Sequence, residues 1–336
     1  MLLSRLAEST LWLARYLERA EDLSRALLAC EQLRLDMGGR EAPGWQRLAP
    51  LVGVDADEAA RLEPSALVGR VILDRRNPSS LLGSLSQARE NLRKVRSLLP
   101  SGCWHTLNPL YLRLEALEPG VAPAELGAVL AQVVASSQRF AGQVAALMLR
   151  DESYAFLRIG VQLERADMML RIATTIAETL IPIDQPFRFE DVRWAGLLRS
   201  VGAYQAYRRR FHTRTDFGSV LELLLFDPAF PRSFAHAIQQ ISSDIDGLPL
   251  NEAPRAAIRA AAPVSVPMSR GGLDQFSETA LADLAHLSAI LAANYFAPPP
   301  DTEHSVANAA RPAPAALRPP SAGERQDSTQ PDVAWI

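Results

Sequence analysis

The sequence predicts an all-α protein: a multi-helix bundle of two pseudo-symmetric repeats, followed by a disordered Pro/Ala-rich C-terminal tail. Three observations predict this fold class. Apolar residues recur at spacings of three, four and seven along most of the chain, which is typical of helices with a buried face. The single extended β-branched run, Val264–Val266, stands between two prolines and indicates a loop rather than a strand. Two motifs occur twice in the same order, which indicates an internal repeat.

Helical periodicity defines the elements in order. Residues 2–37 carry apolar side chains at helical spacing, and Gly38-Gly39 ends the pattern. Asn77-Pro78 marks a later helix start, because proline in a first turn loses no hydrogen bond. Short connections favour antiparallel packing of successive helices. The other helices are predicted near 44–52, 64–73, 79–99, 103–117, 122–149, 152–180, 190–212, 217–225, 231–247, 251–262 and 272–296.

The composition changes at Ala297. Eight prolines and many Ala and Ser residues follow, and such a segment cannot bury enough apolar area to offset its ordering entropy. Residues 298–336 are therefore predicted to form a disordered tail. The helical domain then spans residues 1–297, with repeat halves of about 1–148 and 149–297.

Charge and cysteine content limit the kinds of partner and compartment. The 336-residue chain has a formal net charge of -3, which gives no electrostatic reason to expect nucleic acid or an anionic membrane as a partner. We find no signal-peptide core and no apolar stretch of about 18 residues that could span a membrane. The two cysteines, Cys30 and Cys103, are too few for a disulfide framework, so we expect reduced thiols in a cytoplasmic protein.

The repeat rests on two pairs of segments. Residues 11–25 are LWLARYLERAEDLSR, and residues 157–171, 146 positions later, are LRIGVQLERADMMLR. Residues 71–80 are VILDRRNPSS, and residues 224–233, 153 positions later, are LLFDPAFPRS; both contain D-x-x-x-P-x-S. One match in a helical protein rich in Leu and Arg would be weak. Two matches in the same order argue for duplication and approximate two-fold symmetry.

These segments resemble the alpha-E family, which is named for a repeated Glu-Arg motif. The resemblance covers about residues 1–297 and departs at Val161-Gln162, where the family more often repeats the Arg-Tyr of Arg15-Tyr16. A strictly symmetric role for Arg15 or Tyr16 is therefore not expected. The segments that carry the resemblance are WLARYLERAE at 12–21, VILDRRNPSSLLGSLSQARENLR at 71–93, LRDESYAFLRIGVQLERADM at 149–168, LLRSVGAYQAYRRRF at 197–211 and LLLFDPAFPRS at 223–233.

The resemblance implies a role beside circularly permuted ATP-grasp ligases and transglutaminase-like peptidases. On that basis we expect an accessory or substrate-binding partner of an ATP-grasp-type amide ligase, acting in a peptide synthesis or modification system. Two alternatives stay open: an amide-forming or amide-cleaving enzyme that uses the Glu-Arg residues directly, and a structural dimerisation module. Direct acid–base use would need a glutamate pKa shifted towards neutrality in a closed pocket.

The Glu-Arg residues predict a polar network between helices. Glu18 and Arg19 are adjacent and point about 100° apart on a helix, so they cannot pair with each other. Arg15 and Arg19 are like-charged at i,i+4, as are Glu18 and Asp22, so we expect relief from opposite charges on another helix. The candidate network comprises Arg15, Glu18, Arg19, Arg25, Glu164, Arg165 and Arg171.

Two interpretations of this network are compatible with the sequence. In the first, buried ion pairs fix the register between the halves, with Glu18 facing Arg165 or an arginine of its own half. Breaking a truly buried pair costs about 3–5 kcal/mol. In the second, two carboxylates and two guanidiniums form a pocket for a peptide terminus, another carboxylate or a phosphate, because arginine binds such groups with two parallel hydrogen bonds.

The D-x-x-x-P-x-S segments predict helix ends and starts. Asp74 and Asp227 end apolar helices, Asn77 is the predicted N-cap of the following helix, and Ser80 and Ser233 are placed in first turns. The free N–H groups of a helix start can bind an anion, but an internal cap is the simpler interpretation.

The remaining signals predict no metal site and no cofactor. The five histidines are dispersed, and no glycine-rich nucleotide loop or nucleophile elbow is present. The run Tyr204–Arg214 combines aromatic and basic residues. Core tyrosines beside solvated arginines explain that run better than a nucleic-acid-binding face does, given the acidic net charge.

Overall fold

The computed structural model describes residues 2–37, 44–180, 190–212, 215–262 and 269–297. Every secondary-structure element in these ranges is helical, which confirms the predicted all-α class for the described residues. None of these helices is long and apolar enough to cross a membrane. The loop predicted at Val264–Val266 and the tail predicted at 298–336 lie outside the described residues. The chain divides into two units, Met1–Ala297 and Pro298–Ile336, and the description below concerns the first.

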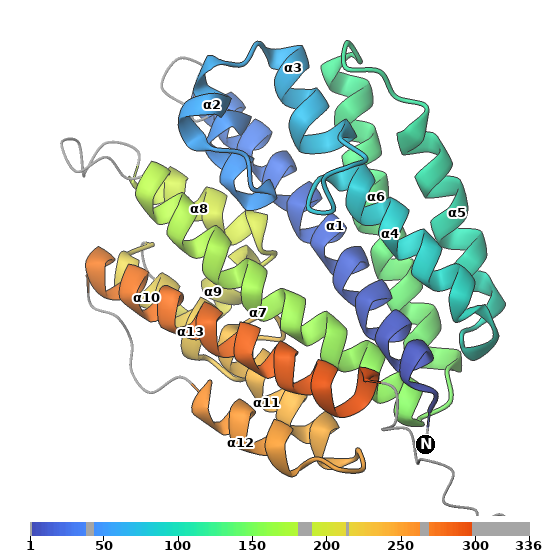
Figure 1. The fold of residues 1–336 in the computed structure, drawn as a ribbon. Coiled ribbons are helices and arrows are strands. Elements are labelled where there is room, and N and C mark those ends of the chain that lie inside the picture. Colours follow the sequence, from blue (N-terminus) through green and yellow to red (C-terminus); the bar gives the residue numbers. More distant parts are fainter. Residues whose placement is uncertain (1, 38–43, 181–189, 213–214, 263–268, 298–336) are drawn as a thin grey trace, which may run out of the picture. The chain divides into compact units, whose positions relative to one another are not determined.

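The helices follow one another with short connections (Figure 1). Short 3-10 helices cover Trp45–Val52 and Arg96–Leu98, and π-helical turns cover Gly69–Leu73, Glu222–Phe226 and Ala292–Phe296. The α-helices are α1 (Ser4–Asp36), α2 (Ala56–Arg61), α3 (Pro64–Val68), α4 (Leu81–Lys94), α5 (Ser101–Glu115), α6 (Pro123–Leu147), α7 (Glu152–Leu180), α8 (Glu190–Ser200), α9 (Tyr204–Phe211), α10 (Phe217–Leu221), α11 (Phe234–Asp246), α12 (Glu252–Ala260) and α13 (Arg270–Leu291).

The long helices α1 and α7 run side by side and pack tightly against each other (Figure 1). Gly160 of α7 makes the close approach possible, because a Cβ at this position would lie 2.4 Å from the carbonyl oxygen of Leu11 and 3.0 Å from the Cβ of Ala14. Eighteen of the 33 residues of α1 are buried, so this helix has neighbours on several sides. The two Glu-Arg dipeptides lie on these two helices and are therefore held at one helix–helix contact.

Each of the two long helices packs against two helices of its own set, and a third helix packs against those two in the same pattern. In the first set, α1 contacts α4 and α6, while α5 contacts both α4 and α6. In the second set, α7 contacts α11 and α13, while α12 contacts both α11 and α13. Figure 1 shows the first set on the side of α1 away from α7 and the second set beside α7.

The two D-x-x-x-P-x-S segments have the same local structure. Each follows a π-helical turn and ends at a serine that caps the next helix. The Ser80 hydroxyl donates to the carbonyl of Asp74 (2.6 Å) and accepts from the N–H of Gly83 (3.0 Å). The Ser233 hydroxyl donates to the carbonyl of Asp227 (2.7 Å) and accepts from the N–H three residues further on (3.0 Å). The predicted internal caps are therefore present, but the serines form them.

The predicted N-cap at Asn77 is wrong by three residues. The N–H of Ser80 bonds to the Asn77 carbonyl at 3.1 Å, so a turn precedes the helix. The Asn77 side chain instead accepts from the N–H of Ser79 (2.9 Å) and donates to the carbonyl of Val52 (2.7 Å). Asn and Ser cap helices about equally well, so composition could not choose between them.

Two further boundaries differ from the sequence predictions. The single helix predicted at 190–212 is two helices, because Gly202 adopts a left-handed conformation (φ 71°) between α8 and α9. Helix α2 was not predicted. Asp55 begins it by accepting from the N–H groups of Asp57 (2.9 Å) and Glu58 (3.0 Å), an arrangement that stabilises a helix too short to show apolar periodicity.

Candidate functional site

The two Glu-Arg dipeptides exchange partners between α1 and α7. The guanidinium of Arg165 donates to Glu18, with Nε 2.8 Å from Oε1. The guanidinium of Arg19 donates to Glu164, with Nε 2.5 Å from Oε1. Glu18 is 5% exposed and Glu164 is 0% exposed. Each glutamate therefore pairs with the arginine of the other dipeptide, inside the protein.

Both arginines that pair with Glu164 lie on α1. Arg15 Nε lies 2.8 Å from Glu164 Oε2, so one carboxylate offsets the like charges of Arg15 and Arg19. Both guanidiniums also lie over aromatic rings, Arg15 over Trp12 (4.9 Å to the ring centroid) and Arg19 over Tyr16 (5.5 Å). The two rings stack on each other with centroids 5.3 Å apart, which fixes this side of the network.

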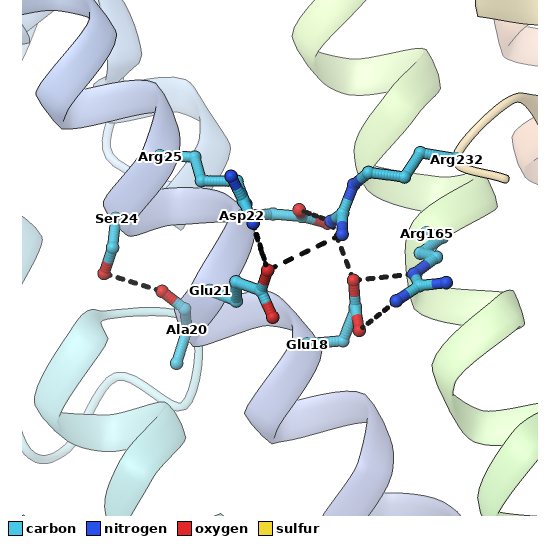
Figure 2. Close-up of polar contacts among 8 residues, drawn as sticks. All are labelled: Glu18, Ala20, Glu21, Asp22, Ser24, Arg25, Arg165 and Arg232. Carbon is cyan, nitrogen blue, oxygen red and sulfur yellow. Dashed lines mark hydrogen bonds and ion pairs between the residues drawn. The ribbon is translucent and has the colours of Figure 1, made fainter. Parts of the chain in front are cut away.

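The two arginines that pair with Glu18 lie on different elements, Arg165 on α7 and Arg232 outside that helix. Arg232, in the turn before α11, lies 2.7 Å from Glu18 Oε1 and also pairs with Asp22 (Figure 2). The same guanidinium lies 3.6 Å from Glu21 Oε1. Arg232 therefore offsets the like charges of Glu18 and Asp22, as Glu164 does for the two arginines of α1.

The sequence prediction missed Arg232. Its position is fixed because the next residue, Ser233, caps α11. At a shift of 153 its counterpart is the uncharged Ser79, and at a shift of 146 the counterpart of Arg15 is the uncharged Val161. The first copy of the repeat has an arginine at 15 where the second has Val161, and the second has Arg232 where the first has Ser79. This exchange between matched positions is the feature of the sequence that could have pointed to Arg232.

The comparisons with known proteins add the family. A family model described as a predicted alpha-helical domain with a conserved ER motif matches residues 2–296. This chain belongs to the alpha-E family. Uncharacterized proteins of Mycobacterium bovis and of two strains of Mycobacterium tuberculosis are 24% identical over 268 residues, which cover 73% of this chain and 30% of each relative. The chain thus matches less than a third of the length of these relatives. No solved structure matches.

The other two predicted arginines of this alpha-E chain pair with acids on their own helices. Arg25 donates to Glu21 (2.7 Å) and joins the network through that carboxylate. Arg171 donates to Asp167 (2.6 Å), and its side chain is 45% exposed. Both are i,i+4 pairs, and Glu21 and Asp167 are matched positions of the two segments.

Both motif glutamates stay ionised near neutral pH. Burial alone would raise the pKa of Glu18, but attraction to Arg165 and Arg232 outweighs burial and lowers it. Attraction to Arg15 and Arg19 likewise outweighs burial and lowers the pKa of Glu164. The network is thus a set of charge-assisted hydrogen bonds, the strong kind.

Asp22 behaves differently within the same network. Burial, together with repulsion from Glu18 and Glu21, raises the pKa of Asp22 to about 7, although Arg232 opposes the shift. Asp22 lines a cavity of about 10 Å³ together with Arg165 and Arg232. That volume is about what one water molecule needs.

The remaining predicted residues lie in turns or in the core. Asp74, Asn77, Ser80 and Asp227 shape the helix starts and do not contact the glutamates, and Ser233 acts only through its neighbour Arg232. No group of three or more His, Cys, Asp or Glu residues in the described part of the chain is placed to hold a metal ion.

Two side predictions concern the cysteines and the aromatic–basic run. Both Cys30 and Cys103 are buried outside any disulfide, and burial raises the pKa of each thiol to about 12. In α9, Tyr207 is buried and stacks on Phe211 with ring centroids 5.0 Å apart, while the three arginines that separate them are exposed. The core role predicted for the tyrosines therefore holds for Tyr207.

Proposed function

We propose that this alpha-E domain is a non-catalytic accessory or substrate-binding partner of an ATP-grasp-type amide ligase, in a peptide synthesis or modification system. One observation carries the non-catalytic part: the Glu-Arg residues form a buried, mutually paired lock between α1 and α7. A general acid or base needs a pKa near the working pH and contact with substrate. The lowered pKa values of Glu18 and Glu164 are the opposite of the first requirement, and Glu164 is also fully buried.

Asp22 does not support the alternative that the protein is an enzyme. Its pKa of about 7 would suit proton transfer. Its side chain, however, is held by Arg232, and the cavity of about 10 Å³ that it lines admits no substrate. The raised pKa of Asp22 is explained by burial and by its neighbours Glu18 and Glu21, so it needs no catalytic role.

The proposal that the partner is a ligase rests on membership of the alpha-E family and on the greater length of the relatives. The alpha-E resemblance implies work beside circularly permuted ATP-grasp ligases, with transglutaminase-like peptidases as further partners. The cysteine content, which is too low for a disulfide framework, supports a cytoplasmic location. In the mycobacterial relatives the matched segment is 30% of the chain, so it occurs beside much further sequence. A domain that acts together with a second domain fits that arrangement.

We also infer that the helical unit arose by duplication, with approximate two-fold symmetry between its halves. The reciprocal pairs Glu18–Arg165 and Glu164–Arg19 support this, because a two-fold axis makes each contact occur twice. The matching serine caps and the matching contacts within α1, α4, α5, α6 and within α7, α11, α12, α13 add independent support.

A pull-down tests the partner proposal. The tagged full-length chain is expressed in its own organism, and the bound proteins are identified by mass spectrometry, with the Glu8→Gln variant of an exposed α1 residue as a control. We expect an ATP-grasp-type ligase to be enriched with both chains, and the addition of purified chain to raise product formation by that ligase. Absence of any ligase, combined with a stable dimer in light scattering, would favour the dimerisation module. Turnover of amide substrates by the purified chain alone would favour the enzyme.

A further inference from the structure

A cavity of about 130 Å³ lies beside Glu18, between α1, α6 and α7. Its mouth is formed in part by Ala141 and Ala145, two exposed residues of α6. Most of its wall is apolar, with side chains of Leu17, Phe140, Val144, Leu157 and Val161. The cavity is thus open to solvent on one side and reaches the ion-pair network on the other.

Two of the residues that line this cavity each carry a buried polar atom that has no hydrogen-bond partner within the described residues. These atoms are the Ser137 hydroxyl and Gln162 Oε1, on residues that are 3% and 8% exposed. Buried polar groups are nearly always hydrogen-bonded, because an unpaired one costs free energy. A ligand that brings hydrogen-bond donors into the cavity would recover that free energy.

Glu21 adds a negative charge to the same wall. Arg25 and Arg232 both approach its Oε1 atom, at 2.7 and 3.6 Å, and Figure 2 shows the second carboxylate oxygen pointing away from them. Glu21 also lines the cavity. Three residues that line one small cavity, Ser137, Gln162 and Glu21, therefore each carry an oxygen that can accept a hydrogen bond, and that of Glu21 is anionic.

We propose that this cavity binds a primary ammonium group carried on a short alkyl chain. An ammonium has three donors and no acceptor, which matches the oxygens of Ser137, Gln162 and Glu21. The apolar wall would take the alkyl part. The nearby cation, Arg158, is engaged by the carboxylate of Asp244, 3.1 Å from its Nε.

The position of the cavity follows from a difference between the matched segments. At a shift of 146, Arg158 and Gln162 of α7 correspond to Trp12 and Tyr16 of α1. The rings of Trp12 and Tyr16 stack on each other and occupy the space beside α1 at these positions. Their smaller or more flexible counterparts on α7 line the cavity instead.

Binding by the isolated full-length chain tests this proposal without involving the ligase. The probe is n-butylammonium chloride, titrated in a calorimeter against sodium butyrate and 1-butanol at equal ionic strength. We expect saturable binding of n-butylammonium in the millimolar range or tighter, as befits so small a ligand, and binding about tenfold weaker or absent for the two analogues. No saturable binding of n-butylammonium, or equal binding of butyrate, would overturn the proposal.

Variants locate the site. Ala141→Leu narrows the mouth and should weaken n-butylammonium binding about tenfold, whereas Ala146→Leu, at an exposed α6 residue outside the cavity, should leave it unchanged. Ser137→Ala removes an unpaired hydroxyl, so the fold is retained, and should weaken binding about fivefold. Glu21→Gln removes the anionic oxygen and should weaken n-butylammonium binding more than the other two variants do, with circular dichroism used to confirm that the variant is folded. Equal affinity in wild type, Ala141→Leu and Ser137→Ala would place the ligand elsewhere and refute the assignment.

Discussion

The two motif glutamates share a sequence context but have different surroundings. Glu164 is fully buried between Arg15 and Arg19, and both guanidiniums rest on stacked aromatic rings. Glu18 pairs with Arg165 and with Arg232, which it shares with Glu21 and Asp22, and a cavity adjoins it. We call the Glu164 side of the helix pair sealed and the Glu18 side, which a cavity adjoins, open.

The difference lies in which elements supply the arginines that pair with each glutamate. On the sealed side one helix supplies every cation, so the contact can fix only the register of α1 against α7. On the open side the arginine missing at Val161 is replaced by Arg232 from another element, which ties the turn before α11 into the network. Glu21 and Gln162, which lie on this side, both line the cavity.

The largest expected effect comes from removing the sealed glutamate. Glu164→Gln leaves Arg15 and Arg19 buried without a carboxylate, and we expect it to lower the free energy of unfolding by about 3–5 kcal/mol. Glu18→Gln should cost less, about 2–3 kcal/mol, because Asp22 and Glu21 still face Arg232. Urea unfolding measures both.

Glu8→Gln, at an exposed residue of α1, is the control for this pair and should change stability by less than about 0.5 kcal/mol. A larger loss for Glu18→Gln than for Glu164→Gln would reverse the assignment of sealed and open sides. Losses below about 1 kcal/mol for both would mean that the lock contributes little.

The next effect tests the contact on which both sides depend. Gly160→Ala would place a Cβ 2.4 Å from the backbone oxygen of Leu11, so α1 and α7 must separate, at a cost of about 1–3 kcal/mol. Gly142→Ala is the matched control, since a Cβ at this exposed α6 position meets nothing within 4 Å and should stabilise the helix by about 0.5–1 kcal/mol. Thermal unfolding should therefore shift in opposite directions, and a shared direction would contradict the tight crossing.

The helices and the reciprocal pairs were accessible from sequence, whereas the open side was not. Periodicity placed α1 and α7 to within two residues at each end, and adjacency showed that Glu18 and Arg19 must seek partners elsewhere. Arg232 was missed because its partners lie about 210 positions away, and only the tertiary fold joins a turn to a helix at that distance. The cavity depends on how side chains from three helices fill space, which no local pattern encodes.

Asp22 gives the open side a pH dependence close to neutrality, whereas the sealed glutamate Glu164 responds only at acidic pH. Its pKa is about 7 in the folded protein and near the ordinary 3.8 when unfolded, so the folded state binds more protons between these values. Its contribution to stability is therefore present at low pH and falls as the pH rises towards 7. Asp22→Asn should remove this fall, worth about 2–3 kcal/mol between about pH 5 and pH 8.

Urea unfolding of wild type and Asp22→Asn between about pH 3 and pH 8 measures this effect, and three other carboxyl groups provide controls. Asp244, whose pKa burial raises to about 6, contributes a smaller fall in the same direction that Asp22→Asn retains. Glu18 and Glu164, with lowered pKa values, should add stability that is lost only as the pH falls below about 4.5, the ordinary value. An unchanged pH profile in Asp22→Asn would show that Asp22 is already ionised at pH 5.

The smallest effect separates serines that the fold uses from one that it does not. Ser233 caps α11 and sets the turn that carries Arg232, so Ser233→Ala should cost about 1–2 kcal/mol. Ser137 is equally buried but unpaired, and Ser137→Ala should change stability by less than about 0.5 kcal/mol in the absence of ligand. A buried hydroxyl that contributes nothing to the empty protein, yet strengthens binding of an ammonium, belongs to a binding surface. A loss as large as that of Ser233→Ala would instead make Ser137 part of the core.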